Sequence, residues 1–267
     1  MPDEPIRTPT WRRALVTGAS SGIGRALALR LAAAGTDLVV VARSADRLEQ
    51  LAAEVDASWP GRRVEVLAAD LADRSALARV EQRLASDDEP VDLCVNNAGF
   101  GQHGPVAELD VDAQTAMIDV NVVALTRLST VAARTLRARG HGGILQVSSI
   151  AGFVPAAGTA VYNATKAYVT SYTESLHVEL RGTGVHVTAV CPGFTRTEFQ
   201  ERAGYDAGGV PAWLWHDPDT VAAVALDAVA ANRPVVVPGL ANKVMTATVR
   251  VLPGAVTRRV AGLFSSR

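Results

Sequence analysis

Tyr162 and Lys166 lie four residues apart in the segment YNATK, and together they could carry acid–base chemistry. Residues four apart face the same side of a helix, so the phenol and the ammonium would lie close together. A free tyrosine has a pKa of about 10, and a fixed cation nearby favours the phenolate and lowers that pKa. The same spacing also fits an ordinary helix surface, so the pair alone does not decide between the two interpretations.

A glycine-rich turn, TGASSGIG at 17–24, follows an apolar run and precedes an Ala/Leu-rich segment. This context is typical of a phosphate-binding turn at a helix N-terminus, where free N–H groups and the helix dipole attract an anion. Gly18 and Gly22 would allow close approach of a pyrophosphate, and Gly24 would allow close packing of the helix. The spacing differs from Gly-x-Gly-x-x-Gly, so the alternative is a tight turn that needs glycine for its own geometry.

The elements that would position these groups alternate along the chain. Short apolar runs predict buried strands at 14–18, 37–43, 63–70, 91–99, 142–149, 185–193 and 234–239. Intervening segments predict helices at 22–34, 45–57, 73–85, 112–138, 159–181 and 218–231. This alternation predicts an α/β fold: a single-domain, Rossmann-type doubly wound parallel sheet over residues 1–267, with helices on both faces.

Composition narrows the class of protein. The 267 residues are 48% apolar with a net charge of −1, which is enough for a large core and gives no indication of a nucleic-acid partner. Cys94 and Cys191 lie in separate apolar runs and are expected to be buried free thiols in a reducing, cytoplasmic setting. The polar N-terminus is not expected to be a signal peptide, and no apolar run of about 18 residues predicts a spanning helix. No spacing among the histidines indicates a metal site.

Six motifs in order resemble the short-chain dehydrogenase/reductase family. They are TGASSGIG (17–24), NNAG (96–99), Asn121, SSIAG (148–152), YNATK (162–166) and PGFTRT (192–197). The resemblance implies that Tyr162 is the general acid/base and that Lys166 lowers the tyrosine pKa and binds the nicotinamide ribose. It implies that Ser149 hydrogen-bonds the substrate oxygen and that Asn121 supports a water-mediated proton relay.

The resemblance also implies a cofactor site. The expected cofactor-binding residues are Gly18, Ser20, Ser21, Gly22, Ile23, Gly24, Arg43, Asp70, Leu71, Asn97, Ala98, Gly99, Tyr162, Lys166, Pro192, Gly193, Thr195 and Thr197. Within this set, Pro192, Gly193 and Thr197 match the turn that holds the nicotinamide carboxamide. Asp70 matches a residue near adenine, or alternatively caps the next helix.

Of the two adjacent serines, Ser148 and Ser149, only one is expected to bind the substrate oxygen. Ketone reduction builds negative charge on the oxygen, where Tyr162 could donate a proton and a serine a hydrogen bond. At a strand end, Ser148 and Ser149 point to opposite faces. The family's serine lies thirteen positions before the tyrosine, which selects Ser149 and leaves Ser148 as a strand-end hydroxyl.

The end of the second strand, VVVARS, predicts NADP(H) rather than NAD as the cofactor. An acid there would hold the ribose 2′-hydroxyl of NAD, whereas this chain has Ala42 followed by Arg43. A guanidinium binds a phosphate bidentately, although a solvated loop charge is the alternative for Arg43. A second basic residue within the glycine-rich turn is missing, since Ser20 and Ser21 stand there.

The C-terminal third is expected to determine the substrate. Residues 198–217 match the family's substrate lid and carry Phe199, Tyr205, Trp213, Leu214 and Trp215. These side chains either indicate a lipophilic carbonyl or alcohol or pack the lid onto the core or another subunit. Residues 240–267 lack acids and predict two amphipathic helices separated by Pro253-Gly254. They either contact an anionic membrane surface or acidic carrier, or form a docked extension, which we favour.

The sequence therefore predicts an NADP(H)-dependent carbonyl reductase/alcohol dehydrogenase acting on a small molecule, with a lipophilic ketone or 3-oxoacyl-type substrate. Steroid-like ketones, 3-oxoacyl thioesters and small or polyol substrates remain open. The alternative is a non-catalytic regulatory member of the family that senses NADP(H). Asn121, Ser149, Tyr162 and Lys166 are all present, which favours the enzyme. The resemblance also implies a homodimer or homotetramer.

Overall fold

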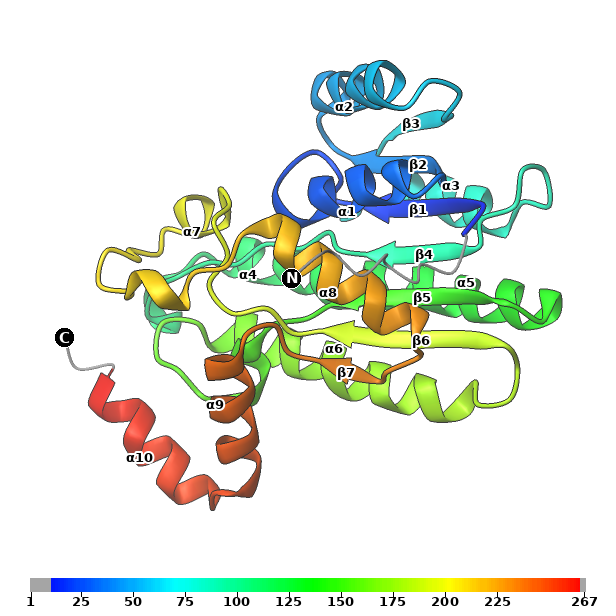
Figure 1. Cartoon of the computed structure of the whole chain (residues 1–267). Helices are drawn as coiled ribbons and strands as arrows, with labels where there is room; N and C mark the ends of the chain where they lie inside the picture. The colour runs from blue at the N-terminus through cyan, green and yellow to red at the C-terminus, as the bar shows by residue number, and fades with distance from the viewer. Residues whose placement is uncertain (1–10, 265–267) are drawn as a thin grey trace.

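Seven parallel strands form one sheet in the order β3-β2-β1-β4-β5-β6-β7 in this computed structural model, which describes residues 11–264. The strands are β1 (Arg13–Thr17), β2 (Asp37–Ala42), β3 (Val64–Ala68), β4 (Leu93–Asn96), β5 (Gly142–Val147), β6 (Val185–Val190) and β7 (Val235–Val236). The strand order reverses between β1 and β4, where doubly wound sheets bind ligands beyond the carboxyl ends of the strands. The predicted fold class is confirmed (Figure 1).

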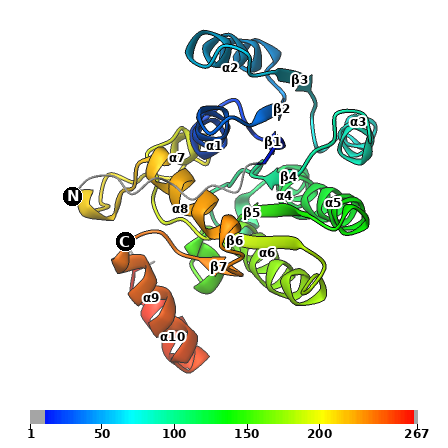
Figure 2. The same ribbon diagram turned by 45° about the vertical axis from the view of Figure 1, so that its right-hand side comes forward.

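Helices cover both faces of the sheet, as Figures 1 and 2 show. One face carries α1 (Gly22–Ala33), α2 (Ala45–Ser58) and α8 (Pro218–Ala230), and the other carries α3 (Arg74–Ala85), α5 (Leu125–Arg139) and α6 (Ala160–Glu179). Each layer buries its own apolar cluster, with Leu27, Leu31 and Leu226 in one and Leu77, Leu128 and Leu136 in the other. Because both faces are covered, the inner strands are buried along nearly their whole length, whereas the edge strand β3 exposes Glu65.

The predicted helix at 112–138 is present, but it is not one regular helix. It consists of α4 (Val111–Ile118), a π-helical segment η2 (Asp119–Ala124) and α5. By length and a mean hydropathy of 1.4 this stretch could span a bilayer, contrary to the sequence-based expectation. Its buried residues Leu125, Leu128 and Ala132 belong to the core cluster under the sheet, so we interpret it as a core helix.

Several strands end earlier than the apolar pattern predicts. β3 ends at Ala68, β5 at Val147 and β6 at Val190, two or three residues before the predicted ends. The residues that follow turn toward the site: Ala69, Ser148 and Cys191 are still buried and each keeps one backbone hydrogen bond to the neighbouring strand, but the regular ladder has ended. A hydrophobic pattern reports this burial and not the point where regular strand pairing stops, so it extends the strands too far.

The C-terminal extension forms the two predicted helices, α9 (Leu240–Val251) and α10 (Gly254–Phe264). α9 packs on the 3-10 segment η3 (Ile150–Phe153), which follows β5. The docked alternative thus holds for α9, whereas the described side chains of α10 are mostly exposed, and contact with an anionic membrane surface or acidic carrier stays an untested alternative. Residues 1–10, for which no signal peptide is expected, and residues 265–267 of the extension lie outside the described residues.

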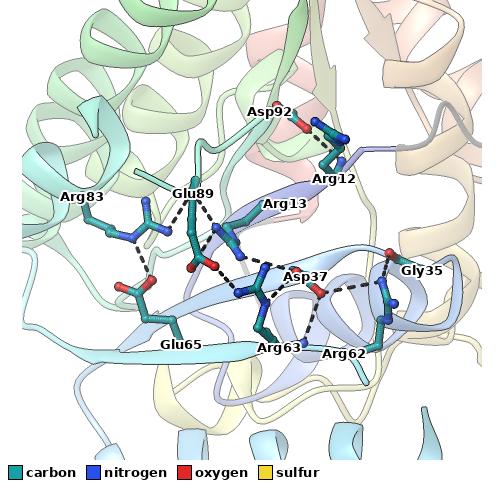
Figure 3. Close-up of polar contacts among 10 residues, drawn as sticks. All are labelled: Arg12, Arg13, Gly35, Asp37, Arg62, Arg63, Glu65, Arg83, Glu89 and Asp92. Atoms are coloured by element: carbon teal, nitrogen blue, oxygen red, sulfur yellow. Dashed lines mark hydrogen bonds and ion pairs between the residues drawn. The ribbon is translucent and has the colours of Figure 1, made fainter. Parts of the chain in front are cut away.

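An ion-pair network joins the amino ends of the strands (Figure 3). Arg13, which begins β1 and is 6% exposed, donates from Nη1 to the Glu89 carbonyl at 2.7 Å. Its Nη2 lies 3.4 Å from the carboxylate of Asp37, the first residue of β2. The backbone N–H of Arg12 donates to Asp92 at 2.8 Å. The network therefore fixes the end of the sheet opposite the glycine-rich turn.

Candidate active site

The glycine-rich turn joins β1 to α1 at the carboxyl end of the sheet. Gly18 and Gly22 have φ angles of 65° and 53°, which favour glycine. A Cβ on Gly24 would lie 2.3 Å from the Gly18 carbonyl oxygen, so glycine is also required for the close packing of α1. The N-cap residue Ser21 makes no side-chain capping bond, so no capping side chain satisfies the first N–H groups of α1. A helix N-terminus in this state is suited to a phosphate.

Tyr162 and Lys166 lie on one face of α6, beside the ends of β5 and β6. The Lys166 Nζ lies 5.8 Å from the centre of the Tyr162 ring and donates to the Val147 carbonyl at 2.9 Å. Ser149 follows β5 and accepts from the Ala151 N–H at 3.1 Å. These contacts hold the ammonium and the serine hydroxyl beside the phenol.

Burial dominates the protonation of this pair. It raises the pKa of Tyr162 to about 12, with the hydrogen bond to Ser149 acting in the opposite direction. Burial also lowers the pKa of Lys166 to about 8. Desolvation of the phenolate is the main cause of the raised tyrosine pKa, and the expected lowering of that pKa by Lys166 stays a prediction. At neutral pH the phenol holds its proton and is suited to donate it.

Asn121 lies behind the pair, within the π-helical segment η2, and is 1% exposed. Its Nδ2 donates to the Phe100 carbonyl at 2.9 Å and to Thr165 at 3.1 Å, and its Oδ1 accepts from the Phe100 N–H. A Cβ on Gly99 would lie 2.9 Å from Asn121 Oδ1 and 3.5 Å from Lys166 Nζ. Asn121 thus holds the backbone of Phe100, next to Gly99, which lies between Asn121 and Lys166. Its role in a proton relay stays a prediction.

The two serines occupy the different positions that their alternation predicts. The Ser148 hydroxyl donates to the Lys166 carbonyl at 2.9 Å and lies 2.8 Å from the Thr170 hydroxyl. Ser148 is buried and ties β5 to α6, whereas the Ser149 hydroxyl lies 3.5 Å from the Pro192 carbonyl and acts to lower the pKa of Tyr162. Ser149 is therefore the serine available to a substrate oxygen.

The cofactor end of the site is formed by residues after β2 and β3. Arg43 is exposed and lines the main cavity, and among residues 11–264 it makes no ion pair. Asp70 also lines the cavity and accepts from the Ala72 N–H at 3.0 Å. The N-cap of α3 is Asp73, which accepts from the Ala76 N–H, so the capping alternative for Asp70 is wrong.

A second cation at this end, Arg47, was missed by the sequence reasoning. It lies in the first turn of α2, lines the same cavity, and places Nη1 3.0 Å from the Glu198 carboxylate. Glu198 also pairs with Arg202 in α7 (Phe199–Arg202). A basic residue in the helix turn that follows β2 is the signal that could have identified Arg47.

One cavity of about 1780 Å³ brings the predicted residues together. It is lined by all of them except Gly24 and Asn121, namely Gly18, Ser20, Ser21, Gly22, Ile23, Arg43, Asp70, Leu71, Asn97, Ala98, Gly99, Ser149, Tyr162, Lys166, Pro192, Gly193, Thr195 and Thr197. A pocket for one drug-sized ligand measures roughly 300–1,000 Å³, so this cavity has room for a dinucleotide and a second molecule.

The lid contributes some, but not all, of its aromatic side chains. The Phe199 ring lies 5.4 Å from the Tyr162 ring, and the Tyr205 ring lies 6.0 Å from the Phe194 ring; all four residues line the cavity. Trp213 is 70% exposed and does not contribute to the site. Packing onto the core is therefore confirmed for Trp215, which lies against Phe194, and the lipophilic substrate stays a prediction that the cavity-lining Phe199 and Tyr205 allow.

The donor set fits a dinucleotide that carries an additional phosphate. The glycine-rich turn and the N-terminus of α1 suit a pyrophosphate, and the unpaired Arg43 at the end of β2 suits a phosphate on the adenine ribose. Ala42 offers no carboxylate to a free ribose hydroxyl. The fold and this site together define a dinucleotide-dependent oxidoreductase.

Comparison with known proteins gives the family. Residues 12–207 match the short chain dehydrogenase family, and the chain belongs to it. A probable NADP-dependent dehydrogenase from Haemophilus influenzae is 37% identical over 229 residues, 78% of this chain and 89% of that protein. These matches confirm the predicted family.

Two solved structures resemble nearly the whole chain. A short-chain dehydrogenase from Sphingobium yanoikuyae in complex with NADPH is 36% identical, with a TM-score of 0.81 and 96% of each chain covered. The bulky-bulky ketone specific alcohol dehydrogenase from Comamonas testosteroni is 30% identical, with a TM-score of 0.77 over 92% of this chain and 97% of that one. The predicted cofactor, NADP(H), agrees with the first of these structures.

Proposed function

We propose that this protein is an NADP(H)-dependent carbonyl reductase that reduces lipophilic ketones and, in reverse, oxidises the corresponding secondary alcohols. One observation carries the proposal: a single cavity joins Arg43, which has no ion-pair partner in the described part of the chain, to a protonated phenol beside the aromatic Phe199 of the lid. The ketone-specific relative from Comamonas testosteroni supports a ketone substrate. The two buried, free cysteines are consistent with a reducing compartment such as the cytoplasm.

The bound cofactor supplies the hydride that is added to the carbonyl carbon. The chain's own residues manage the charge on the oxygen. The Ser149 hydroxyl donates a hydrogen bond where negative charge develops, and Tyr162 transfers its proton to that oxygen. Lys166, fixed by the Val147 carbonyl, holds positive charge beside the phenolate that remains. Phe199 covers the phenol and limits the access of water.

The experiment is an assay of NADPH absorbance with a panel of lipophilic ketones, 3-oxoacyl esters and polyol-type substrates. Tyr162→Phe removes the transferable proton and should lower turnover by about a hundredfold or more, with little change in NADPH affinity. Tyr168→Phe is the matched control, because Tyr168 lies on the same helix but is exposed and its hydroxyl contacts Thr126. Full turnover by Tyr162→Phe, with chemistry limiting the rate, would contradict the proposal.

The same assay separates the enzyme from the regulatory alternative. A sensor would bind NADPH tightly and turn over no member of the panel. The presence of Asn121, Ser149, Tyr162 and Lys166 in one place favours turnover.

A further inference from the structure

The C-terminal helices reach the same cavity as the catalytic residues. Met245 and Val249 of α9, Leu252 at its end and Thr257 of α10 line the cavity that also contains Tyr162. Met245, Val249 and Leu252 follow the spacing i, i+4, i+7, so they form one apolar stripe on a helix. The extension therefore presents a hydrophobic surface to the site in addition to the aromatic lid.

α9 is anchored at its N-terminal end to the turn expected to hold the nicotinamide. Asn242 is 4% exposed, and its Nδ2 lies 3.0 Å from His216 Nε2 and 3.1 Å from the Pro238 carbonyl. A Cβ on Gly193 would lie 2.4 Å from Asn242 Nδ2, so glycine is needed where helix and turn meet. Thr246, one turn later, is also buried. The first half of α9 is thus fixed beside the Pro-Gly turn.

The second half of α9 is anchored beside the catalytic serine. The Arg250 guanidinium lies 4.9 Å from the centre of the Phe153 ring, in the η3 segment that follows Ser149. Arg250 also lies 3.5 Å from the Glu174 carboxylate of α6, the helix that carries Tyr162. With both halves anchored, the apolar stripe of Met245, Val249 and Leu252 lines the same cavity as Tyr162 and Ser149.

We propose that the C-terminal hairpin, residues 240–259, is the distal wall of the substrate site and selects ketones with an extended apolar body. This inference rests on the proposed function. The carbonyl would lie at Tyr162 and Ser149, with one apolar substituent under the lid and the other against Met245, Val249 and Leu252. A small ketone would not reach this wall and would gain nothing from it.

The test compares one bulky and one small ketone, a steroid ketone and cyclohexanone, with a matched pair of variants. Val249→Trp enlarges a side chain that lines the cavity. Val244→Trp makes the same change at a residue of α9 that is 59% exposed and does not line the cavity. Val249→Trp should lower kcat/KM for the steroid ketone by about tenfold or more and change that for cyclohexanone by less than about twofold. Val244→Trp should change neither value.

Two outcomes would refute the proposal that the C-terminal hairpin forms a wall of the substrate site. An equal loss for both ketones in Val249→Trp would indicate damage to the cofactor site or the fold, and no loss for either would show that the stripe does not contact substrate. Unchanged NADPH affinity and melting temperature in both variants confirm that the fold is intact.

Binding tests the wall without turnover. The Kd of the steroid ketone for the protein–NADP⁺ complex, measured by calorimetry, should rise in Val249→Trp and stay constant in Val244→Trp. If the wild-type protein reduces neither ketone but binds the steroid ketone in this pattern, the wall stands and the proposed reaction fails. If the wild-type complex binds no steroid ketone, the wall is refuted.

Discussion

Replacing Arg43 by leucine should weaken NADPH binding while leaving NADH binding almost unchanged. Arg43 lies at the cofactor end of the cavity, directly after Ala42 at the end of β2. No described carboxylate pairs with it, so its charge is available to a phosphate. Because NADH lacks the 2′-phosphate, the lost interaction should concern NADPH alone.

The magnitude follows from the type of bond lost. A hydrogen bond to a charged group contributes about 1.5–3 kcal/mol, so Arg43→Leu should raise the Kd for NADPH by about ten- to a hundredfold. Arg47→Leu is the comparison, because Arg47 lines the same cavity but already pairs with Glu198. Its effect should be smaller. Adding Ala42→Asp to Arg43→Leu supplies an acceptor for the free ribose hydroxyl and repels the phosphate, so the double variant should prefer NADH.

The assay is a titration of each protein with both cofactors at low and at physiological salt. A wild-type protein that binds NADH as tightly as NADPH would refute the reasoning. So would an Arg43→Leu variant that loses affinity for both cofactors equally. A larger loss in Arg47→Leu than in Arg43→Leu would show that the phosphate is read by α2.

Three further results are expected. Burial lowers the pKa of Lys166 from 10.5 to about 8, so keeping this ammonium charged in the folded protein costs about 3 kcal/mol. Between pH 8 and 10.5 the unfolded chain binds more protons than the folded one, so the stability of the wild type rises with pH across this range. Lys166→Met should therefore melt at a higher temperature than wild type at pH 7, by an amount that disappears above pH 10.5; a pH-independent gain would contradict this. Burial raises the pKa of Tyr162, and alcohol oxidation needs the phenolate, so the rate of oxidation should rise with pH above neutrality while ketone reduction is sustained at pH 7. Initial rates measured in both directions check this, and an oxidation rate that is highest in acid would refute it. Gly24→Ala, whose Cβ would lie 2.3 Å from the Gly18 carbonyl oxygen, should lower the free energy of unfolding by about 1–3 kcal/mol in urea, whereas Gly209→Ala, in open space, should not; equal values would argue against close helix packing.

The fold was predictable where burial and hydrogen bonding coincide. The run DLVVVA is covered on both faces and pairs on both edges, so its apolar letters identify β2 within one residue. The π-helical segment Asp119–Ala124 was not predictable, since a shift of one residue per turn barely alters an apolar pattern. Strand ends were placed too late because Ser148 and Cys191 stay buried after the ladder ends.

The site was predictable to the extent that each role is local in sequence. The conformation of the turn at 17–24 follows from its glycines, and the closeness of Tyr162 and Lys166 follows from their spacing on one helix. Arg47 could have been identified from its place in the helix turn after β2, but its pairing with Glu198, 151 residues away, could not. The contact of α9 with the cavity was also not predictable, since an amphipathic pattern shows that a helix has an apolar face but not which surface that face packs on. The raised pKa of Tyr162 depends on burial by distant segments, which spacing cannot report.

The most direct measurement of the central claim follows a labelled hydride. The wild-type protein is incubated with a lipophilic ketone and NADPH carrying deuterium at the transferred position of nicotinamide C4, and the alcohol is analysed by mass spectrometry. We expect the alcohol to carry one deuterium at the carbinol carbon, and Tyr162→Phe to form it about a hundredfold more slowly. Tight NADPH binding with no labelled alcohol from any ketone, or formation of the labelled alcohol by Tyr162→Phe at the wild-type rate, would contradict the account.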